Sequence, residues 1–189
     1  MEQDGDMKEE EHGKRGKAVR ESVSFILYLI VIVVLTFLMI RYVGQRTRVD
    51  GSSMENTLTN GDNLIVDKIS YRFHEPERFD IIVFPYQYKE DTYFIKRIIG
   101  MPGETVQITD KGEILINGEE LVESYGREVI KDPGLASDPI TLGEDEYFVM
   151  GDNRNNSNDA REWETHYVSR DEVLGKAWFR YYPSIKVIK

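Results

Sequence analysis

An uncharged apolar segment near the amino terminus constrains this chain more than any other feature. Ser22 to Ile40 runs for 19 residues without a charged side chain, between Glu21 and Arg41. As an α-helix it would be about 28 Å long, close to the roughly 30 Å hydrocarbon core of a bilayer. A buried core helix is rarely apolar on every face, and a cleaved signal peptide has a shorter apolar region that ends in small residues. The segment is therefore predicted to be a retained transmembrane helix.

Positive charge is unequally distributed about this segment. The amino-terminal flank carries five basic residues, Lys8, Lys14, Arg15, Lys17 and Arg20. A comparable length on the other side carries three, Arg41, Arg46 and Arg48. Because the flank richer in lysine and arginine stays in the cytoplasm, residues 1–21 are predicted to be a cytoplasmic tail. Residues 22–40 are then a single-pass anchor in the cell membrane, and residues 41–189 form an extracytoplasmic domain.

The composition excludes several kinds of chemistry. The chain has no cysteine and only three histidines, which excludes thiol proteases, thiolate zinc sites and disulfides and argues against a multi-histidine metal site. Its formal charge of −10 would repel nucleic-acid phosphates. We therefore expect no metal, no other cofactor and no nucleic-acid partner.

The pattern after the anchor is that of β-structure. Short runs rich in β-branched and aromatic residues alternate with turn formers, and no long stretch has the 3.6-residue apolar period of a helix. The expected strands are residues 63–66, 80–84, 93–99, 104–108, 113–116, 121–122, 147–150 and 177–181. Asn117-Gly118 is the strongest hairpin signal among the turns. The sequence thus predicts a mostly β domain behind a single transmembrane helix.

Two residues are candidates for nucleophilic chemistry. Ser53 follows Gly51 in a predicted turn, where its backbone N–H and its hydroxyl can face the same point. Lys96 lies in a predicted strand and shares a face with Phe94 and Ile98, and apolar neighbours lower the pKa of a lysine by desolvation. A neutral lysine can take a proton from a serine hydroxyl. The alternatives at this point are an ordinary serine-rich loop and a strand lysine that reaches into water.

A polar loop follows the predicted strand at residues 147–150. Its sequence resembles a calcium loop starting at Asp152, but the sixth position would be Ser157 instead of glycine and the twelfth Trp163 instead of glutamate. The loop is better interpreted as a hydrogen-bonded support for a neighbouring site. Asp159 and Arg161 could form an ion pair there, and Ser157 could hydrogen-bond an amine.

Taken together, these segments resemble the bacterial type I signal peptidases, which are membrane-bound serine–lysine endopeptidases. The resemblance covers nearly the whole chain in the family's order and is closest to the compact Gram-positive type. After the anchor come five motifs: Gly51-Ser-Ser-Met54 with Thr57, Gly61-Asp-Asn-Leu-Ile-Val-Asp-Lys68, Arg78-Phe-Asp-Ile-Ile-Val-Phe84, Phe94-Ile-Lys-Arg-Ile-Ile-Gly-Met-Pro-Gly103, and Gly151-Asp-Asn-Arg154 with Ser157, Asp159 and Arg161.

The resemblance implies a role for each matching residue. Ser53 matches the nucleophile and Lys96 the general base, with the Ser53 N–H as an oxyanion donor. Some relatives add a hydroxyl two residues before the nucleophile, where this chain has Gly51. Phe94 and Ile95 fall where the family lines its pockets for small substrate side chains.

The supporting residues are implied in the same way. Ser157 matches a residue that hydrogen-bonds the lysine amine. Asp152, Asp159 and Arg161 match a supporting ion-pair network. The implied fold is mostly β, and the substrate is expected to dock as an extended strand.

Two positions depart from the family pattern. Asn56 stands where proline usually precedes the threonine of the first motif, and Ala160 stands where a serine usually lies between Asp159 and Arg161. If proline presets this turn, Asn56→Pro should leave activity unchanged or raise it and add about 0.4–1 kcal/mol of stability.

The chain is therefore expected to remove signal peptides from exported preproteins, cleaving after small residues of the Ala-X-Ala type. Its expected partners are preprotein signal peptides and the lipid bilayer, while the oligomeric state is left open. The alternative is a catalytically weak or inactive relative that binds exported chains, although such a protein would be expected to lack Ser53 or Lys96. A soluble autocleaving serine–lysine regulator conflicts with the predicted anchor.

Overall fold

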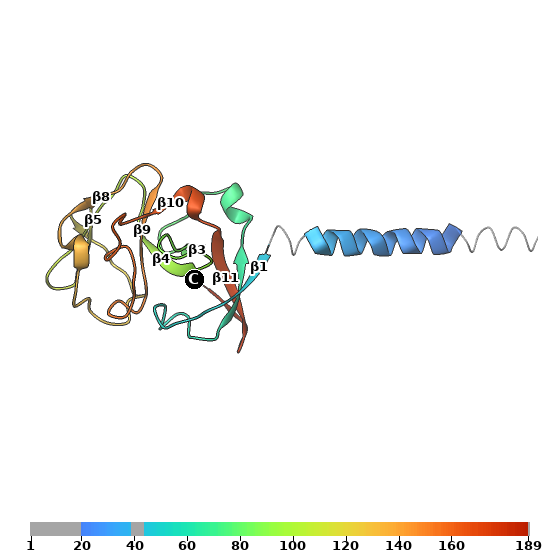
Figure 1. Cartoon of the computed structure of the whole chain (residues 1–189), viewed down its shortest axis with the longest axis horizontal. Helices are drawn as coiled ribbons and strands as arrows, with labels where there is room; N and C mark the ends of the chain where they lie inside the picture. The colour runs from blue at the N-terminus through green and yellow to red at the C-terminus, as the bar shows by residue number, and fades with distance from the viewer. Residues whose placement is uncertain (1–19, 39–43, 189) are drawn as a thin grey trace, which may run out of the picture. The chain divides into compact units, whose positions relative to one another are not determined.

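The computed structural model describes residues 20–38 and 44–188, and the chain divides into two compact units at residues 1–43 and 44–189 (Figure 1). In the first unit, Arg20–Leu38 form a helix that is long and apolar enough to cross a membrane. The predicted anchor therefore overlaps this helix along most of its length. Its last two residues, Met39 and Ile40, and the predicted tail up to residue 19 lie outside the described residues.

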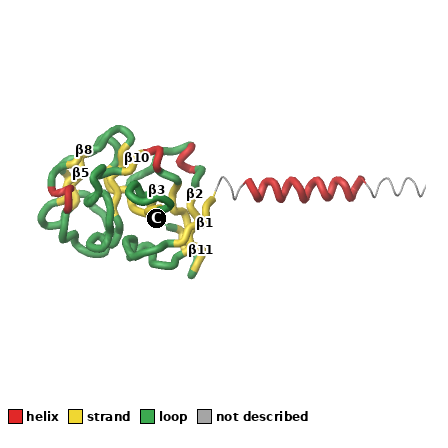
Figure 2. Tube along the Cα trace, viewed as in Figure 1, coloured by secondary structure: helices red, strands yellow, loops and turns green. Residues whose placement is uncertain are grey.

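The second unit is built on two antiparallel sheets (Figure 2). The larger sheet has eight strands in the order β1-β2-β11-β3-β4-β9-β10, with β12 paired to β11. Its strands are β1 (Gly44–Arg48), β2 (Asn63–Asp67), β3 (Ile81–Pro85), β4 (Tyr93–Gly100), β9 (Glu146–Met150), β10 (Val168–Ser169), β11 (Gly175–Tyr182) and β12 (Lys186–Val187).

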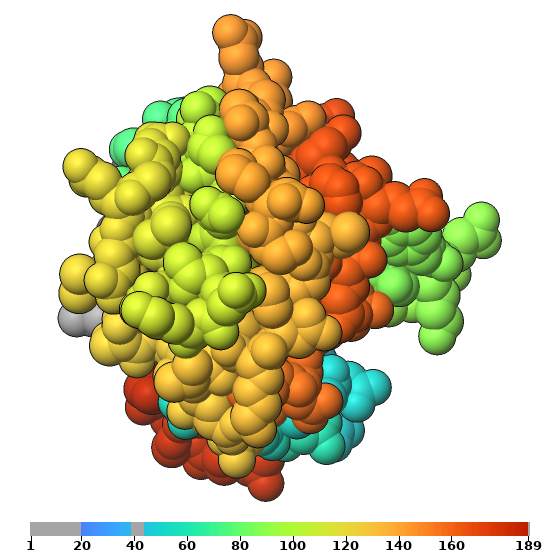
Figure 3. Space-filling model, turned by 90° about the vertical axis from the view of Figure 1, so that its left-hand side faces the viewer, coloured from blue at the N-terminus to red at the C-terminus, as the bar shows by residue number. Residues whose placement is uncertain are grey.

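The smaller sheet has four strands in the order β7-β6-β5-β8 and comes from the segment between β4 and β9. Its strands are β5 (Thr105–Ile108), β6 (Ile114–Ile116), β7 (Glu119–Glu120) and β8 (Ile140–Thr141). Figure 3 views the second unit from the end that carries this sheet, and its yellow and light-orange residues cover much of that face.

Helical turns in the second unit are short. They are the 3-10 turns η1 (Ser70–Arg72), η2 (Gly134–Ser137) and η3 (Arg170–Glu172). The prediction of a mostly β domain is confirmed, because the remaining regular structure described from residue 44 onward is strand.

The hairpin at Asn117-Gly118 forms as predicted, but its second strand was misplaced. Both turn residues have positive φ, 53° and 85°, as a two-residue hairpin turn requires. After a two-residue turn the next residue already pairs with the preceding strand. The pairing strand is therefore β7 at Glu119–Glu120 and not residues 121–122.

Two groups of buried side chains pack the second unit. One includes Ile82, Phe84 and Ile98 of the larger sheet together with Val106 and Ile108 of the smaller sheet, so it joins the two.

The other group contains Met54, Leu58, Leu64 and Ile81, with Ile95 of β4 packed against it. Because side chains alternate along a strand, Phe94 packs against the first group and its neighbour Ile95 against the second. This alternation determines where each side chain of the candidate site lies.

Candidate active site

Ser53 and Lys96 lie together, although 43 positions separate them in the chain. The Lys96 amine donates a hydrogen bond of 2.8 Å to the Ser53 Oγ. Ser53 lies in the turn that joins β1 to β2, residues 51–57, which we call the nucleophile turn, and Lys96 lies in the middle of β4. The fold thus places a serine hydroxyl and a lysine amine within proton-transfer distance.

Lys96 lies in apolar surroundings, as its position in the strand predicts. Only 3% of its surface is exposed, and its Nζ lies 4.7 Å from the centroid of the Phe94 ring. Desolvation by burial lowers the pKa of Lys96 from 10.5 to about 8, while the carboxylates of Asp159 and Asp152 partly oppose this shift. The amine is therefore close to the pKa that a base acting near neutral pH needs.

The nucleophile turn is held by the loop that follows β9, residues 151–161, which we call the polar loop. The Asn153 N–H donates to the Ser53 carbonyl at 2.9 Å, and the Asn153 amide donates to the Ser52 carbonyl at 3.1 Å. The Asn156 amide donates to the Ser52 hydroxyl at 2.9 Å. These bonds fix the peptide planes on both sides of Ser53. Among the described residues, the Ser53 N–H has no acceptor, which leaves it available to a substrate oxyanion.

Gly151 allows the polar loop to approach the nucleophile turn closely. A β-carbon at this position would collide with the Ser157 hydroxyl and with the Ser53 carbonyl oxygen. The approach therefore requires a residue without a side chain.

Ser157 lies beside this contact, but the expected hydrogen bond from the Lys96 amine is absent. Its hydroxyl is buried and has no hydrogen-bond partner within residues 20–38 and 44–188. The described contacts thus give the Lys96 amine one side-chain hydrogen-bond partner, Ser53.

Asp152 connects the nucleophile turn to β4. Its two carboxylate oxygens accept hydrogen bonds of 2.8 and 2.7 Å from the Arg97 guanidinium, and neither side chain is exposed. The Thr57 hydroxyl, four residues after Ser53, also donates to Asp152. Because Arg97 follows Lys96 in the strand, this ion pair holds the backbone that carries the amine.

Asp159 and Arg161 form the second ion pair, as predicted from their spacing. The Arg161 Nε lies 2.8 Å from Asp159 Oδ1, and the other carboxylate oxygen accepts the Gly151 N–H at 3.0 Å. Arg161 also donates to the Arg154 carbonyl at 2.6 Å, so the pair ties the polar loop together.

Sequence reasoning missed Arg97 as a supporting residue. A signal was present, because Arg97 stands between Ile95 and Ile99 on one face of a strand that reads as buried, and a buried guanidinium needs an anionic partner. Asn153 and Asn156 gave no such signal, since asparagines are common in any loop.

The prediction that Asn56→Pro would preserve activity and add stability is wrong. Asn56 has a φ of 91°, in the left-handed region, whereas proline fixes φ near −65°. We now expect Asn56→Pro to lower the free energy of unfolding by more than about 1 kcal/mol and to reduce cleavage with it. Asn56→Gly should preserve both, because glycine adopts positive φ readily. Urea denaturation of the two variants measures the free energy of unfolding. A proline variant as stable as the parent would contradict the positive φ of Asn56.

Among the residues that the structure describes, no strand pairs with one edge of β4 next to Lys96. β4 pairs with β3 from Tyr93 to Arg97, but it pairs with β9 only from Arg97 onward. The N–H and C=O of Ile98 bond to residues on the β3 side, so by alternation the backbone groups of Ile95 and Tyr93 point to the side where β9 is absent. An extended peptide could pair there.

Phe94 and Ile95 flank this open edge from opposite faces of β4. Phe94 stacks on Tyr86 with ring centroids 4.1 Å apart, on the face of Lys96, while Ile95 packs against the group that contains Met54. Their assignment to substrate pockets remains a prediction.

No metal centre accompanies the site in the part of the chain that the structure describes. Within residues 20–38 and 44–188, no group of three or more histidine or acidic side chains is placed to hold a metal ion.

These features define a class of protein: a β domain with a hydroxyl nucleophile candidate and a buried amine, in a chain with an apolar helix long enough to span a membrane. The family described as signal peptidase, peptidase S26, matches residues 21–182. The chain therefore belongs to this family. The prediction of a type I signal peptidase, a serine endopeptidase, is confirmed, and the helix at residues 20–38 fits a membrane-anchored member.

The chain is similar to signal peptidases of several bacteria. It is 40% identical over 151 residues to the probable signal peptidase I-2 of Synechocystis sp., an alignment that covers 77% of this chain and 66% of the relative. It is 42% identical over 149 residues to signal peptidase I of Leptolyngbya laminosa, covering 75% and 70%. A crystal structure of a signal peptidase I from Enterococcus faecalis V583 aligns with a TM-score of 0.44 and 34% identity, over 55% of this chain and 97% of that chain.

Proposed function

We propose that this protein removes signal peptides from exported preproteins with a Ser53–Lys96 dyad and cleaves after small residues of the Ala-X-Ala type. The observation that carries the proposal is the 2.8 Å contact between the Ser53 hydroxyl and an amine that is almost completely buried. With a pKa of about 8, about a tenth of the Lys96 side chains are neutral at pH 7, against fewer than one in a thousand for an ordinary lysine.

The chemistry follows from these positions. Neutral Lys96 takes the proton of the Ser53 hydroxyl while Oγ attacks the carbonyl carbon of the scissile bond. The Ser53 N–H stabilises the resulting oxyanion, and the Lys96 ammonium then protonates the leaving amine, which leaves an ester on Ser53. A water molecule attacks this ester while Lys96 takes a proton from it. The Lys96 ammonium then protonates Ser53 Oγ as the ester bond breaks, which releases the carboxylic acid product and restores the Ser53 hydroxyl and the neutral amine.

The open edge of β4 supports docking of the substrate as an extended strand. Pairing with the backbone of Ile95 and Tyr93 would align a peptide whose scissile carbonyl reaches Ser53. Alternate side chains of such a peptide point to the same side, which suits a requirement for small residues at two positions separated by one. In this arrangement Phe94 and Ile95 line the surfaces that limit side-chain size.

The second candidate is a relative that binds exported chains without cutting them. The contact between Ser53 and Lys96 disfavours it, because a binding protein gains nothing from a buried amine that is costly to desolvate. The remaining polar groups around the pair also support catalysis, since Asn153 and Asp152 restrain both partners.

Cleavage of a purified preprotein in detergent tests the proposal. The parent should release a mature chain whose new amino terminus follows an Ala-X-Ala sequence, and Ser53→Ala should release none. A matched control is Ser137→Ala, which removes the hydroxyl of an exposed serine outside the site and should cleave like the parent. Equal cleavage by the parent and by Ser53→Ala would refute the dyad.

We also propose that residues 1–21 are cytoplasmic and that the catalytic domain lies outside the membrane, anchored by residues 22–40. Protease added to intact protoplasts should then digest the domain after residue 41 and leave an amino-terminal epitope protected. Loss of that epitope together with survival of a carboxyl-terminal epitope would show the opposite orientation.

A further inference from the structure

An extended segment that follows β7 lies against the candidate site. Burial alternates along residues 121–125: Leu121, Glu123 and Tyr125 are half-buried, while Val122 and Ser124 are exposed. Such alternation identifies a strand-like segment with one face turned toward the protein, although no strand pairs with it among the described residues.

Ion pairs fasten this segment on both sides of Tyr125. Glu123 lies 2.6 Å from the guanidinium of Arg154, which is buried in the polar loop. Arg127 lies 2.6 Å from Glu55, which is two residues after Ser53 in the nucleophile turn. One short segment is thus attached to both loops of the site.

Tyr125 itself packs on the buried ion pair of Arg97 and Asp152. The centre of the Arg97 guanidinium lies 3.6 Å from the centroid of the Tyr125 ring, and Phe79 packs on Tyr125 at 5.1 Å. A guanidinium stacked on an aromatic ring is held in one orientation without competing for its hydrogen bonds. The N–H groups of Arg97 therefore remain directed at Asp152.

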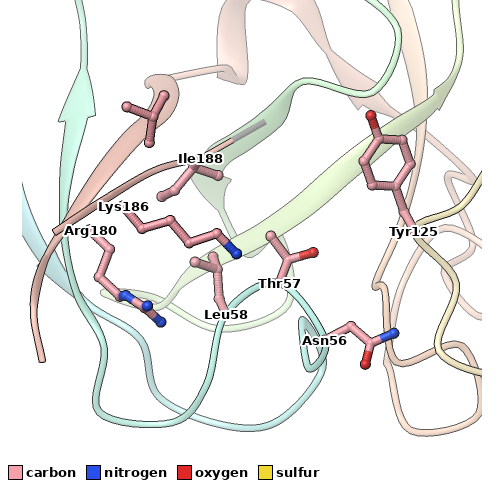
Figure 4. Close-up of a pocket in the computed structure, with 8 residues that line it drawn as sticks. Asn56, Thr57, Leu58, Tyr125, Arg180, Lys186 and Ile188 are labelled. Atoms are coloured by element: carbon pink, nitrogen blue, oxygen red, sulfur yellow. The ribbon is translucent and has the colours of Figure 1, made fainter. Parts of the chain in front are cut away.

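A pocket of about 250 Å³ lies next to Tyr125 (Figure 4). Its lining includes Tyr125 and Thr57, together with the exposed residues Asn56 and Lys186. Tyr125 contacts Arg97, and Thr57 hydrogen-bonds Asp152, so these two lining residues also touch the ion pair.

The ion pair is buried although two residues that line this pocket contact it. The side chains of Arg97 and Asp152 are both fully buried, whereas the pocket opens beside exposed side chains. Without the ring of Tyr125, water from the pocket would reach the pair, and an ion pair in contact with water is weaker and screened by salt.

We propose that Tyr125 is a positioning residue for the Ser53–Lys96 reaction: its ring separates the pocket from the Arg97–Asp152 pair and thereby keeps the nucleophile turn in register with β4. The inference rests on the proposed function. Tyr125 acts through the pair and touches neither reacting group. Small displacements of a nucleophile from its base are costly to the rate, so loosening the pair lowers kcat while the substrate edge and KM are unaffected.

Four variants and two salt concentrations test this proposal. Tyr125→Ala should lower kcat for preprotein cleavage by about 10- to 100-fold, with KM within about twofold of the parent. Its remaining activity should fall several-fold further between about 0.05 and 0.5 M NaCl, because the pair is now screened. Tyr125→Phe keeps the ring and should match the parent at both salt concentrations. Val122→Ala, in the same segment but exposed, is the matched control.

Tyr125→Leu keeps an apolar side chain, but leucine is shorter than the tyrosine ring and leaves part of the pair open to the pocket. This variant should therefore share the salt sensitivity even if Tyr125→Ala fails to fold. Thermal melting of each variant separates loss of folded protein from loss of kcat. An active parent together with unchanged kcat in both Tyr125→Ala and Tyr125→Leu would overturn this inference alone, as would a Tyr125→Phe variant as impaired as Tyr125→Leu. A parent that did not cleave would overturn the proposed function and this inference with it.

Discussion

Lys96→Arg is expected to lower kcat for preprotein cleavage by at least about a thousandfold, within the range that a general base contributes. Arginine keeps the positive charge, but it does not deprotonate in proteins and so cannot take the proton of Ser53. The variant separates a role as a base from a role as a charge. Initial rates under saturating preprotein, with the folded fraction checked by melting, provide the measurement.

Lys176→Arg is the matched control for this prediction. Like Lys96, Lys176 is a strand lysine with a side-chain partner, but its partner is the Asp80 carboxylate, and it lies in β11 outside the proposed dyad. Its variant should cleave at close to the parent rate. Substantial turnover by Lys96→Arg would show that the proton of Ser53 goes elsewhere.

Asp152→Ala is expected to cost about 3–5 kcal/mol of folding free energy, which is typical of removing one partner of a buried ion pair. The Arg97 guanidinium would lose both hydrogen bonds to the carboxylate, and the Thr57 hydroxyl would lose its acceptor. For a domain of this size such a loss lowers the melting temperature by roughly 10 °C. Calorimetry of the purified protein measures it.

Asp152→Asn provides the comparison, since it keeps the shape and one acceptor oxygen but removes the charge. Its loss of stability should be smaller than that of the alanine variant. Arg127→Ala, which removes an exposed ion pair in the same region, should change stability by less than about 1 kcal/mol. An alanine variant at position 152 that melted like the parent would mean that the pair does not hold the nucleophile turn to β4.

The strands that carry the site could be predicted because their hydrophobic pattern is local. Residues 93–99 were expected as a strand, and β4 extends one residue further, to Gly100. The face that Lys96 shares with Phe94 followed from alternation alone, and the Phe94 ring indeed lies beside the amine. By contrast, β10 and β12 have two residues each, and no periodicity can be read from two residues.

The long-range supporting contacts could not be predicted because their partners are distant in the chain, unlike the pair of Asp159 and Arg161. Arg97 and Asp152 are 55 positions apart, and nothing near either residue indicates the other. The conformation of Asn56 was misjudged for a related reason. The analogy with proline assumed an ordinary φ, whereas the observed φ of 91° arises in a turn held by distant residues such as Asn153.

The central claim is that Lys96 acts on Ser53 as a neutral amine, and the pH dependence of kcat/KM tests it most directly. This ratio reports the ionisation of the free enzyme. Because the base must be deprotonated, kcat/KM should rise with pH, about tenfold per unit well below the pKa, and level off above it. Because burial lowers the pKa of Lys96 to about 8, the rise in kcat/KM should level off above about pH 8. A ratio that stayed constant from about pH 6 to about pH 10, or that rose only near the ordinary lysine value of about 10.4, would contradict the account.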